Sequence, residues 1–179
     1  PLFLSRPGFL KALSVLEDGP LFKVVPMRKA KIGILVTGTE VFQGLIEDRF
    51  APIITQKAQQ HHCEVVKTLF APDDAALIVR GVRDLLDAGA DFIVTTAGMS
   101  VDPDDLTRKG LTEAGLTDTL YGVPALPGTM TLIGRIGGAQ IIGVPACALF
   151  FKTTVFDIIL PRMLAGVPIT RLDLAKIGN

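Results

Sequence analysis

A run of small residues followed by carboxylates lies between a predicted strand and a predicted helix. Thr96-Ala97-Gly98-Met99-Ser100 is the small-residue part, and Asp102, Asp104 and Asp105 follow it. A turn of this kind at the end of a strand exposes backbone N–H groups that can cradle an anionic group. The carboxylates can hold a metal ion or accept hydrogen bonds from a heterocycle. A structural interpretation stays open, in which Ser100 or Asp102 caps the helix and the other acids complement its dipole.

Strands and helices alternate on both sides of this turn. The predicted strands are 31–37, 64–70 and 91–96, and the predicted helices are 47–62, 74–88 and 104–114. The continuous apolar run of the first strand is typical of a parallel sheet that is covered on both faces. This alternation predicts an α/β fold with three layers, α-β-α, and a mostly parallel sheet.

The last third of the chain has a different pattern. Residues 131–142 read as a β-hairpin around a pair of glycines. A strand-turn-helix junction follows at 143–147, and one long helix, kinked near Pro161, is predicted from there to Leu164. Phe150 and Phe151 belong to its apolar residues, which we expect in the core or in an interface.

The first residues read as a segment that leads into the domain. An amphipathic helix is predicted after Ser5, a weak strand pattern lies at 21–25, and 26–29 reads as a linker. The chain starts without a methionine, so we expect 1–29 to connect to a preceding domain and 30–179 to form the domain described by the patterns above.

Composition excludes several classes of protein. The 18 basic and 18 acidic residues cancel, whereas a general nucleic-acid binder needs a positive excess. Two cysteines make neither a disulfide framework nor a zinc site. Cys147 at a helix start could have a lowered pKa, although a small buried cysteine is the simpler interpretation. The apolar stretch 146–164 is interrupted by charges and a proline, so we expect no membrane span and a cytoplasmic protein.

Four junctions are expected to meet at one edge of the sheet, because each follows the carboxyl end of a predicted parallel strand. They are 37–44, 71–74, 96–105 and 143–147. A pocket needs several groups to converge, so this arrangement carries more weight than any single motif. Glu40 is the lone acid in its loop. Asp73 and Asp74 are candidates for chemistry as well, or they cap the following helix.

At these junctions the sequence resembles the molybdopterin-binding domain family, which includes MoaB/Mog-type molybdopterin adenylyltransferases and the central domain of MoeA-type molybdenumtransferases. The segments that match, in order, are Thr37-Gly38-Thr39-Glu40, Pro72-Asp73-Asp74, Thr95 to Ser100 with Asp105, Leu126-Pro127-Gly128, and Gly143-Val144-Pro145. They are similar to the family's T-G-D/S-E strand end, its D-D or D-N helix start, its T-T-G-G turn with a following aspartate, and its proline-glycine turns. The resemblance covers about residues 30–165.

The resemblance implies that molybdopterin or its adenylylated form binds at these junctions. The residues that it assigns to binding are Thr37, Gly38, Thr96, Ala97, Gly98, Met99, Ser100, Pro127, Gly128, Gly143 and Pro145. Those that it assigns to catalysis are Asp105, Asp74, Asp73 and Glu40, with Mg²⁺ held by Asp105 and Asp73. The implied chemistry is adenylyl transfer from Mg-ATP or molybdate insertion, in a homo-oligomer that is a dimer or a trimer.

Two other interpretations stay open. A CinA-type domain shares the T-G-x-E start and hydrolyses nucleotide pyrophosphates. A carrier or sensor of the finished cofactor would bind without catalysing, and Ala97 and Ala146-Cys147, which replace a family glycine and a G-N pair, favour it. The motif Val101-Asp102-Pro103-Asp104-Asp105 and the ending Phe156 to Arg162 look closest to a less characterised branch that carries an N-terminal domain.

Overall fold

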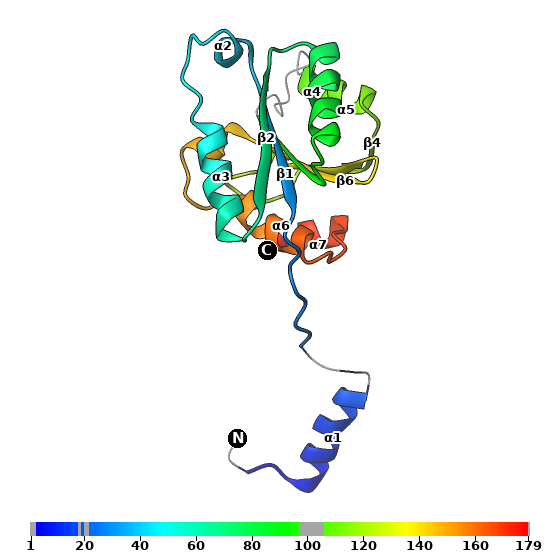
Figure 1. Ribbon diagram of the computed structural model, residues 1–179. Coiled ribbons are helices and arrows are strands. Elements are labelled where there is room, and N and C mark those ends of the chain that lie inside the picture. The colour runs from blue at the N-terminus through cyan, green and yellow to red at the C-terminus, as the bar shows by residue number, and fades with distance from the viewer. Residues whose placement is uncertain (1–2, 18, 20–21, 97–105, 179) are drawn as a thin grey trace.

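A mixed sheet forms the middle of the fold (Figure 1). The computed structural model describes residues 3–17, 19, 22–96 and 106–178, and within them six strands lie in the order β2-β1-β3-β6-β5-β4. Their bounds are β1 Lys31–Thr37, β2 Glu64–Ala71, β3 Phe92–Thr96, β4 Leu116–Tyr121, β5 Leu132–Ile136 and β6 Ala139–Val144. β1 pairs in parallel with β2 and β3, and β3 with β6, whereas β5 runs antiparallel to β4 and β6. The mostly parallel sheet and the predicted hairpin are confirmed.

Helices cover both faces of the sheet, which confirms the three-layer α-β-α architecture. Their bounds are α3 Phe50–Gln60, α6 Val155–Leu164 and α7 Arg171–Ile177 on one face, and α4 Ala75–Asp87 and α5 Leu106–Glu113 on the other. Successive strand residues point to opposite faces. Ile34 of β1 is therefore buried with α3 and α6, whereas its neighbour Leu35 is buried with α4 and α5.

The single helix predicted from 147 to 164 is wrong. The chain forms a short 3₁₀ helix, η1 Ala146–Leu149, and then opens before α6 begins at Val155. Thr154 caps α6, because its hydroxyl accepts from the Phe156 N–H at 3.2 Å, while Asp157 accepts from the Thr154 N–H at 2.7 Å. This capping box fixes a new helix start. Phe150 and Phe151 lie in the open segment and are 78% and 53% exposed, so neither is a core residue.

Other elements differ from the sequence pattern. The loop predicted after β1 contains a one-turn helix, α2 Thr39–Phe42, and the weak strand pattern at 22–25 forms no strand. The sequence pattern does not predict strand β4, because its residues are mostly polar or exposed and its pairing with β5 is interrupted at Asp118, which has a φ of 50°. Helix α7 is a further difference, although its capping box of Thr170 and Asp173 is readable in the sequence.

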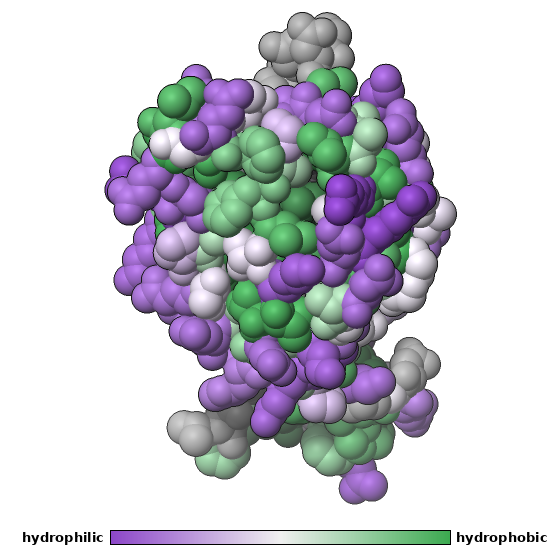
Figure 2. All heavy atoms as spheres, turned by 45° about the horizontal axis from the view of Figure 1, so that its top comes forward, coloured by the Kyte–Doolittle hydropathy of each residue, from purple (hydrophilic) through white to green (hydrophobic). Residues whose placement is uncertain are grey.

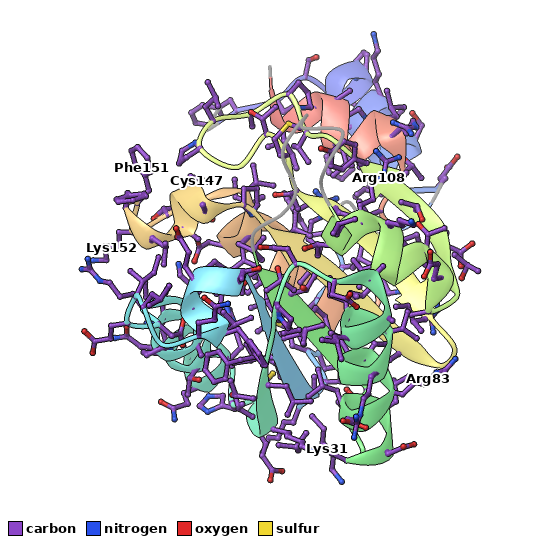
Figure 3. All side chains as sticks on the ribbon, turned by 90° about the horizontal axis from the view of Figure 1, so that it is seen from above. Lys31, Arg83, Arg108, Cys147, Phe151 and Lys152 are labelled. Carbon is purple, nitrogen blue, oxygen red and sulfur yellow. The ribbon has the colours of Figure 1, made fainter. Side chains whose placement is uncertain are left out.

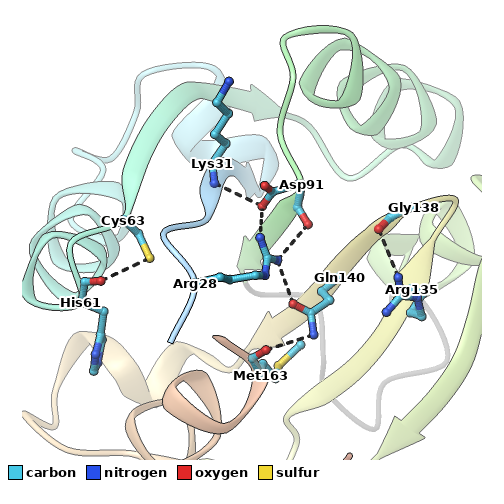
Figure 4. Close-up of polar contacts among 9 residues, drawn as sticks. All are labelled: Arg28, Lys31, His61, Cys63, Asp91, Arg135, Gly138, Gln140 and Met163. Carbon is cyan, nitrogen blue, oxygen red and sulfur yellow. Dashed lines mark hydrogen bonds and ion pairs between the residues drawn. The ribbon is translucent and has the colours of Figure 1, made fainter. Parts of the chain in front are cut away.

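Residues before β1 are attached to the amino-terminal edge of the sheet (Figure 4). Arg28 donates to Asp91 Oδ1 at 2.5 Å and to Gln140 Oε1 at 2.8 Å. Asp91 Oδ1 also accepts from the Lys31 N–H at 3.1 Å, and Gln140 donates to the Met163 carbonyl at 3.3 Å. These hydrogen bonds join the segment that enters the domain to β3, β6 and α6.

The predicted amphipathic helix near the start is confirmed as α1, Arg6–Glu17. It lies away from the sheet in Figure 1, and none of its residues is buried. Among the described helices, α1 included, none combines the length and the apolar character that crossing a membrane requires.

Candidate functional site

The carboxyl ends of the parallel strands meet at one edge, as the sequence predicts. Leu35 of β1 lies opposite both Leu69 of β2 and Thr95 of β3, and Thr95 lies opposite Gly143 of β6. The junctions that follow β1, β2 and β6 therefore start side by side, at the top of the molecule in Figure 1. We call this the carboxyl edge. Open α/β sheets bind ligands at this position.

Buried threonines connect three segments at the carboxyl edge. The Thr37 N–H donates to Thr96 Oγ1 at 3.1 Å, and Thr37 Oγ1 donates to the Thr96 carbonyl at 2.5 Å. Thr107 Oγ1, in the first turn of α5, donates to Thr37 Oγ1 at 3.0 Å. All three residues are buried. This network fixes the ends of β1 and β3 relative to α5, so the predicted binding residues Thr37 and Thr96 have a defined structural role.

Thr95 is the exception among these threonines. Its side chain is fully buried, and its Oγ1 is the one buried side-chain polar atom in the described chain that has no hydrogen-bond partner. A buried hydroxyl without a partner costs on the order of 1–3 kcal/mol. Such groups in native proteins call for an explanation, and functional sites are a frequent one.

Replacing Thr95 with valine is expected to raise the free energy of unfolding by about 1 kcal/mol, because a methyl group takes the place of the unpaired hydroxyl. Urea unfolding measures the change. Thr107→Val is the matched control, because this hydroxyl is equally buried but donates to Thr37. The free energy of unfolding of the control should fall by about 1 kcal/mol, because a hydrogen bond is lost. If Thr95→Val is destabilised as much as the control, the Thr95 hydroxyl is paired in solution.

Asp73 joins two of the junctions. Its Oδ2 accepts from both the N–H and the hydroxyl of Thr39, each at 3.0 Å, and its own N–H donates to Thr39 Oγ1 at 3.1 Å. The turn after β2 is thereby held against the start of α2. Gly38, just before α2, has a φ of 140° that residues other than glycine rarely adopt, and apart from its chain neighbours no described residue has a heavy atom within 4 Å of where a Cβ would stand. A ligand can therefore approach the Gly38 backbone closely.

Asp74 and Glu40 are both exposed but differ in their contacts. Asp74 is the N-cap of α4 and accepts from the Leu77 N–H at 2.9 Å, which is the structural role that the sequence left open. Glu40 lies in the single turn of α2 and has no hydrogen bond or ion pair within the described chain. Of the two, Glu40 has the carboxylate that remains available to a ligand.

The turn with Pro127 and Gly128 packs against the start of α6. The Pro127 carbonyl accepts from the Val155 N–H at 3.0 Å. A Cβ on Gly128 would stand 2.7 Å from the Val155 Cβ, so the backbone of this turn contacts α6 directly. Strand β4 runs parallel to β6, because both are antiparallel to β5, and the loop 122–131 therefore starts at the carboxyl edge.

The fourth junction follows β6. Gly143 is buried within the strand, and Pro145 precedes η1. Cys147 lies in η1, and burial raises the pKa of its thiol above the usual value, which is opposite to the lowered pKa considered from the sequence. Cys147 is therefore a weak nucleophile at neutral pH.

Part of the predicted site lies outside the described residues. These positions are Ala97, Gly98, Met99, Ser100 and Asp105. In the part of the chain that the structure describes, no three His, Cys, Asp or Glu side chains come together as a metal site. Mg²⁺ is commonly held by one or two carboxylates together with substrate phosphates. Asp73 fits a Mg²⁺ site of this kind, because it is a single carboxylate at the carboxyl edge to which substrate phosphates could add.

A pocket of about 270 Å³ opens at the carboxyl edge on the α3 side of the sheet. Its floor includes Thr37 and Thr96, and its walls come from Phe50 and from Leu149 and Phe150 after β6. Figure 2, which brings this end of the molecule forward, shows hydrophobic side chains in the middle of the face and hydrophilic ones around them. A mostly apolar cavity with a few polar groups is the usual form of a small-molecule site.

Residues 33–165 match a protein family described as "Probable molybdopterin binding domain". The chain belongs to this family. Among solved structures, the molybdopterin biosynthesis Mog protein from Mycobacterium ulcerans is similar over 78% of the chain and 99% of its own length, with a TM-score of 0.62 and 20% identity. The molybdopterin biosynthesis enzyme MoaB from Thermus thermophilus is similar over 79% and 99%, with a TM-score of 0.60 and 22% identity. At these identities the likeness shows that the molybdopterin-binding domain shares their fold.

A sequence relative comes from another branch. A CinA-like protein from Mycobacterium sp. (strain JLS) is 38% identical over 78 residues, which is 44% of this chain and 18% of that protein. The match therefore spans under a fifth of the relative's length.

Sequence patterns alone do not identify some residues of the pocket in this molybdopterin-binding domain. Glu47 and Arg49 are at its rim and Phe150 is in its wall. No motif marks Glu47 or Arg49. The sequence pattern groups Phe150 with core or interface residues, because an apolar run gives no sign that a capping box interrupts the helix. The Thr154-Val155-Phe156-Asp157 pattern is the available signal.

Proposed function

We propose that this domain binds molybdopterin or its adenylylated form at the carboxyl edge and acts in the synthesis or handling of the molybdenum cofactor. The observation that carries the proposal is the threonine network of Thr37, Thr96 and Thr107, which assembles three segments beside an apolar pocket. This arrangement occurs within the residues that match the family. The names of the Mog and MoaB neighbours, which refer to molybdopterin biosynthesis, are in accord with it.

The residues present suit an anionic heterocyclic ligand. The pocket can take the ring system, and Gly38 leaves room for a phosphate near the backbone. Glu40 and Asp73 would lie near the reacting groups, with Asp105, Ser100 and the turn 97–99 assigned by resemblance alone. Mg²⁺ and ATP, where they are used, would supply a polarised phosphoryl group, and Asp73 would be the described carboxylate that helps to hold the metal. We expect a cytoplasmic homo-oligomer, a dimer or a trimer.

Two other functions compete with this one. The similarity to CinA-like proteins favours hydrolysis of a nucleotide pyrophosphate as the second candidate. A carrier that binds the cofactor without turnover is the third, supported by Ala97 and Ala146-Cys147 in place of the family's residues. The three differ in whether the ligand contains a pterin and in whether ATP is consumed.

Incubation of the purified chain with molybdopterin tests the proposal. The bound pterin is oxidised to its fluorescent form and followed through gel filtration, with and without Mg-ATP. Co-elution with adenylylation establishes the transferase, whereas co-elution without turnover leaves metal insertion or carriage. In an active protein, Asp105→Ala should lose turnover and keep binding.

The same assay separates the alternatives. If no pterin co-elutes in either condition, the proposed function is wrong for this chain. ADP-ribose is then the next substrate, and its hydrolysis would support the CinA-type function. Light scattering on the same column reports the oligomeric state.

A further inference from the structure

Phe150 is an exposed aromatic residue at the candidate site. It is 78% exposed, yet it lines the pocket at the carboxyl edge. It also lines a second cavity of about 370 Å³, which lies between α3 and the segment before α6. Phe150 therefore lines both cavities, as Leu149 does. The exposed Ile46 lines the same pocket, and contiguous exposed apolar patches with a polar rim commonly mark a ligand or partner site.

The structure explains why Phe150 is held there. η1 ends at Leu149, and α6 begins only at Val155, where the Thr154 and Asp157 capping box fixes its first turn. Lys57 of α3 donates to the Lys152 carbonyl at 2.8 Å, so the segment between the two helices is attached at both ends and in its middle. Seen from above in Figure 3, Phe151 and Lys152 extend from this segment away from the sheet. Phe150 thus belongs to a braced turn.

Glu47 supplies a complementary group on the same pocket. It is exposed at the rim and makes no ion pair or hydrogen bond within the described residues. Its neighbour Asp48 is engaged, because its carboxylate accepts from the N–H groups of Phe50 and Ala51 at the start of α3. Glu47 therefore has a free carboxylate beside an apolar wall.

An aromatic ring and a free carboxylate on one pocket suit a planar heterocycle that carries adjacent N–H donors. The ring stacks on the aromatic face, and the carboxylate accepts two parallel hydrogen bonds, one from a ring N–H and one from an exocyclic amino group. We propose that Phe150 and Glu47 recognise the 2-amino-4-oxo edge of the pterin in this way. The inference rests on the proposed function and names the part of the ligand that the pocket recognises.

The test is a competition experiment on the whole chain. Molybdopterin is bound first, and unconjugated pterin or lumazine is added to displace it. Lumazine has an oxygen where pterin has the 2-amino group, so it would place an acceptor against the Glu47 carboxylate. A site built to accept from an N–H group rejects such an analogue strongly. We expect wild-type protein to prefer pterin over lumazine by at least about tenfold.

Two variants separate the contributions. Glu47→Gln should reduce the preference for pterin to near one, because the amide can donate to the lumazine oxygen. Phe150→Leu should weaken the binding of both pterin and lumazine about tenfold. The preference for pterin should not change, because stacking on an aromatic ring does not depend on the hydrogen-bonding edge of the ligand. The controls are Glu64→Gln and Phe151→Leu. Glu64 has an exposed carboxylate at the amino-terminal end of β2, and Phe151 lines the second cavity but not the pocket at the carboxyl edge. Both should behave as wild type.

The possible results assign any failure to one of the two proposals. No binding of molybdopterin by wild-type protein overturns the proposed function and this inference with it. Binding that is equal in wild type, Glu47→Gln and Phe150→Leu overturns the inference alone. The inference is also overturned if neither pterin nor lumazine displaces bound molybdopterin, since the pocket would then not bind the pterin ring. If Phe150→Leu alters the oligomeric state and leaves pterin affinity intact, Phe150 is an interface residue and the inference is wrong.

Discussion

Replacing Asp157 with alanine is expected to lower the free energy of unfolding by about 3 kcal/mol. Asp157 closes the capping box of α6 with Thr154, and loss of a cap costs about 1 kcal/mol. Its carboxylate also pairs with Lys57, whose side chain is only 11% exposed. A buried charge left without its partner costs several kcal/mol, and partial exposure of this pair reduces that to about 2 kcal/mol. Urea unfolding followed by circular dichroism measures the loss.

Asp173→Ala is the matched control for Asp157→Ala. Asp173 closes the same kind of box on α7 with Thr170, and hydrogen bonds from Thr170 hold the pKa of its carboxyl below the usual value. It is partly exposed and forms no ion pair within the described chain. The control should therefore lose much less stability. A second variant, Lys57→Met with Asp157→Ala, removes both charges and should recover part of the loss. Equal losses for the two aspartates would show that the Lys57 pair contributes nothing.

Replacing Gly128 with alanine is expected to destabilise the domain by about 3 kcal/mol. The φ of Gly128 is 123°, a conformation that is strained for alanine by on the order of 1–2 kcal/mol. The added Cβ would also stand 2.7 Å from the Val155 Cβ and 2.9 Å from its backbone nitrogen. Overpacking against backbone costs about 1–3 kcal/mol more, because α6 cannot move away without breaking its capped start.

Gly38→Ala separates strain from packing. Its φ of 140° is as unfavourable for alanine, but apart from its chain neighbours no described residue has a heavy atom within 4 Å of the added Cβ. The expected loss is about 1–2 kcal/mol. Both glycines are predicted binding residues, so molybdopterin affinity is measured for each under conditions where the variant stays folded. If Gly128→Ala is no less stable than Gly38→Ala, the contact with Val155 is not rigid in solution.

Elements that carry their own pattern could be predicted from the sequence. The apolar run Lys31–Thr37 and the stripe of Ile78, Val82 and Leu85 identify β1 and α4, because burial on one or both faces fixes where apolar residues must stand. Strand β4 has no such pattern. It lies at an edge of the sheet, so pairing with β5 replaces burial as the main constraint, and polar residues are tolerated there.

The candidate site could be predicted in position and only partly in detail. The rule that parallel strands end together was enough to bring 37–44, 71–74 and 143–147 to one edge. The bond between Asp73 and Thr39 joins residues 34 positions apart and depends on how two loops meet, which no local pattern encodes. The unpaired hydroxyl of Thr95 is likewise a property of the packed structure. Ser100 and Asp105 remain predictions, since they lie outside the described residues.

The antiparallel strand β5 has a consequence for how this fold can change its ligand. Tyr121, Leu132 and Gly143 stand in one row across β4, β5 and β6. The loop 122–131 therefore leaves the carboxyl edge and returns to it without a crossover helix. Changes at exposed positions of that loop, such as Leu126, can alter the carboxyl edge while β1, β2 and β3 keep their register. Within the loop, Gly128 packs against α6 and Thr131 is buried, whereas Leu126 is 87% exposed, so positions that stabilise the domain and positions that are free to vary lie side by side.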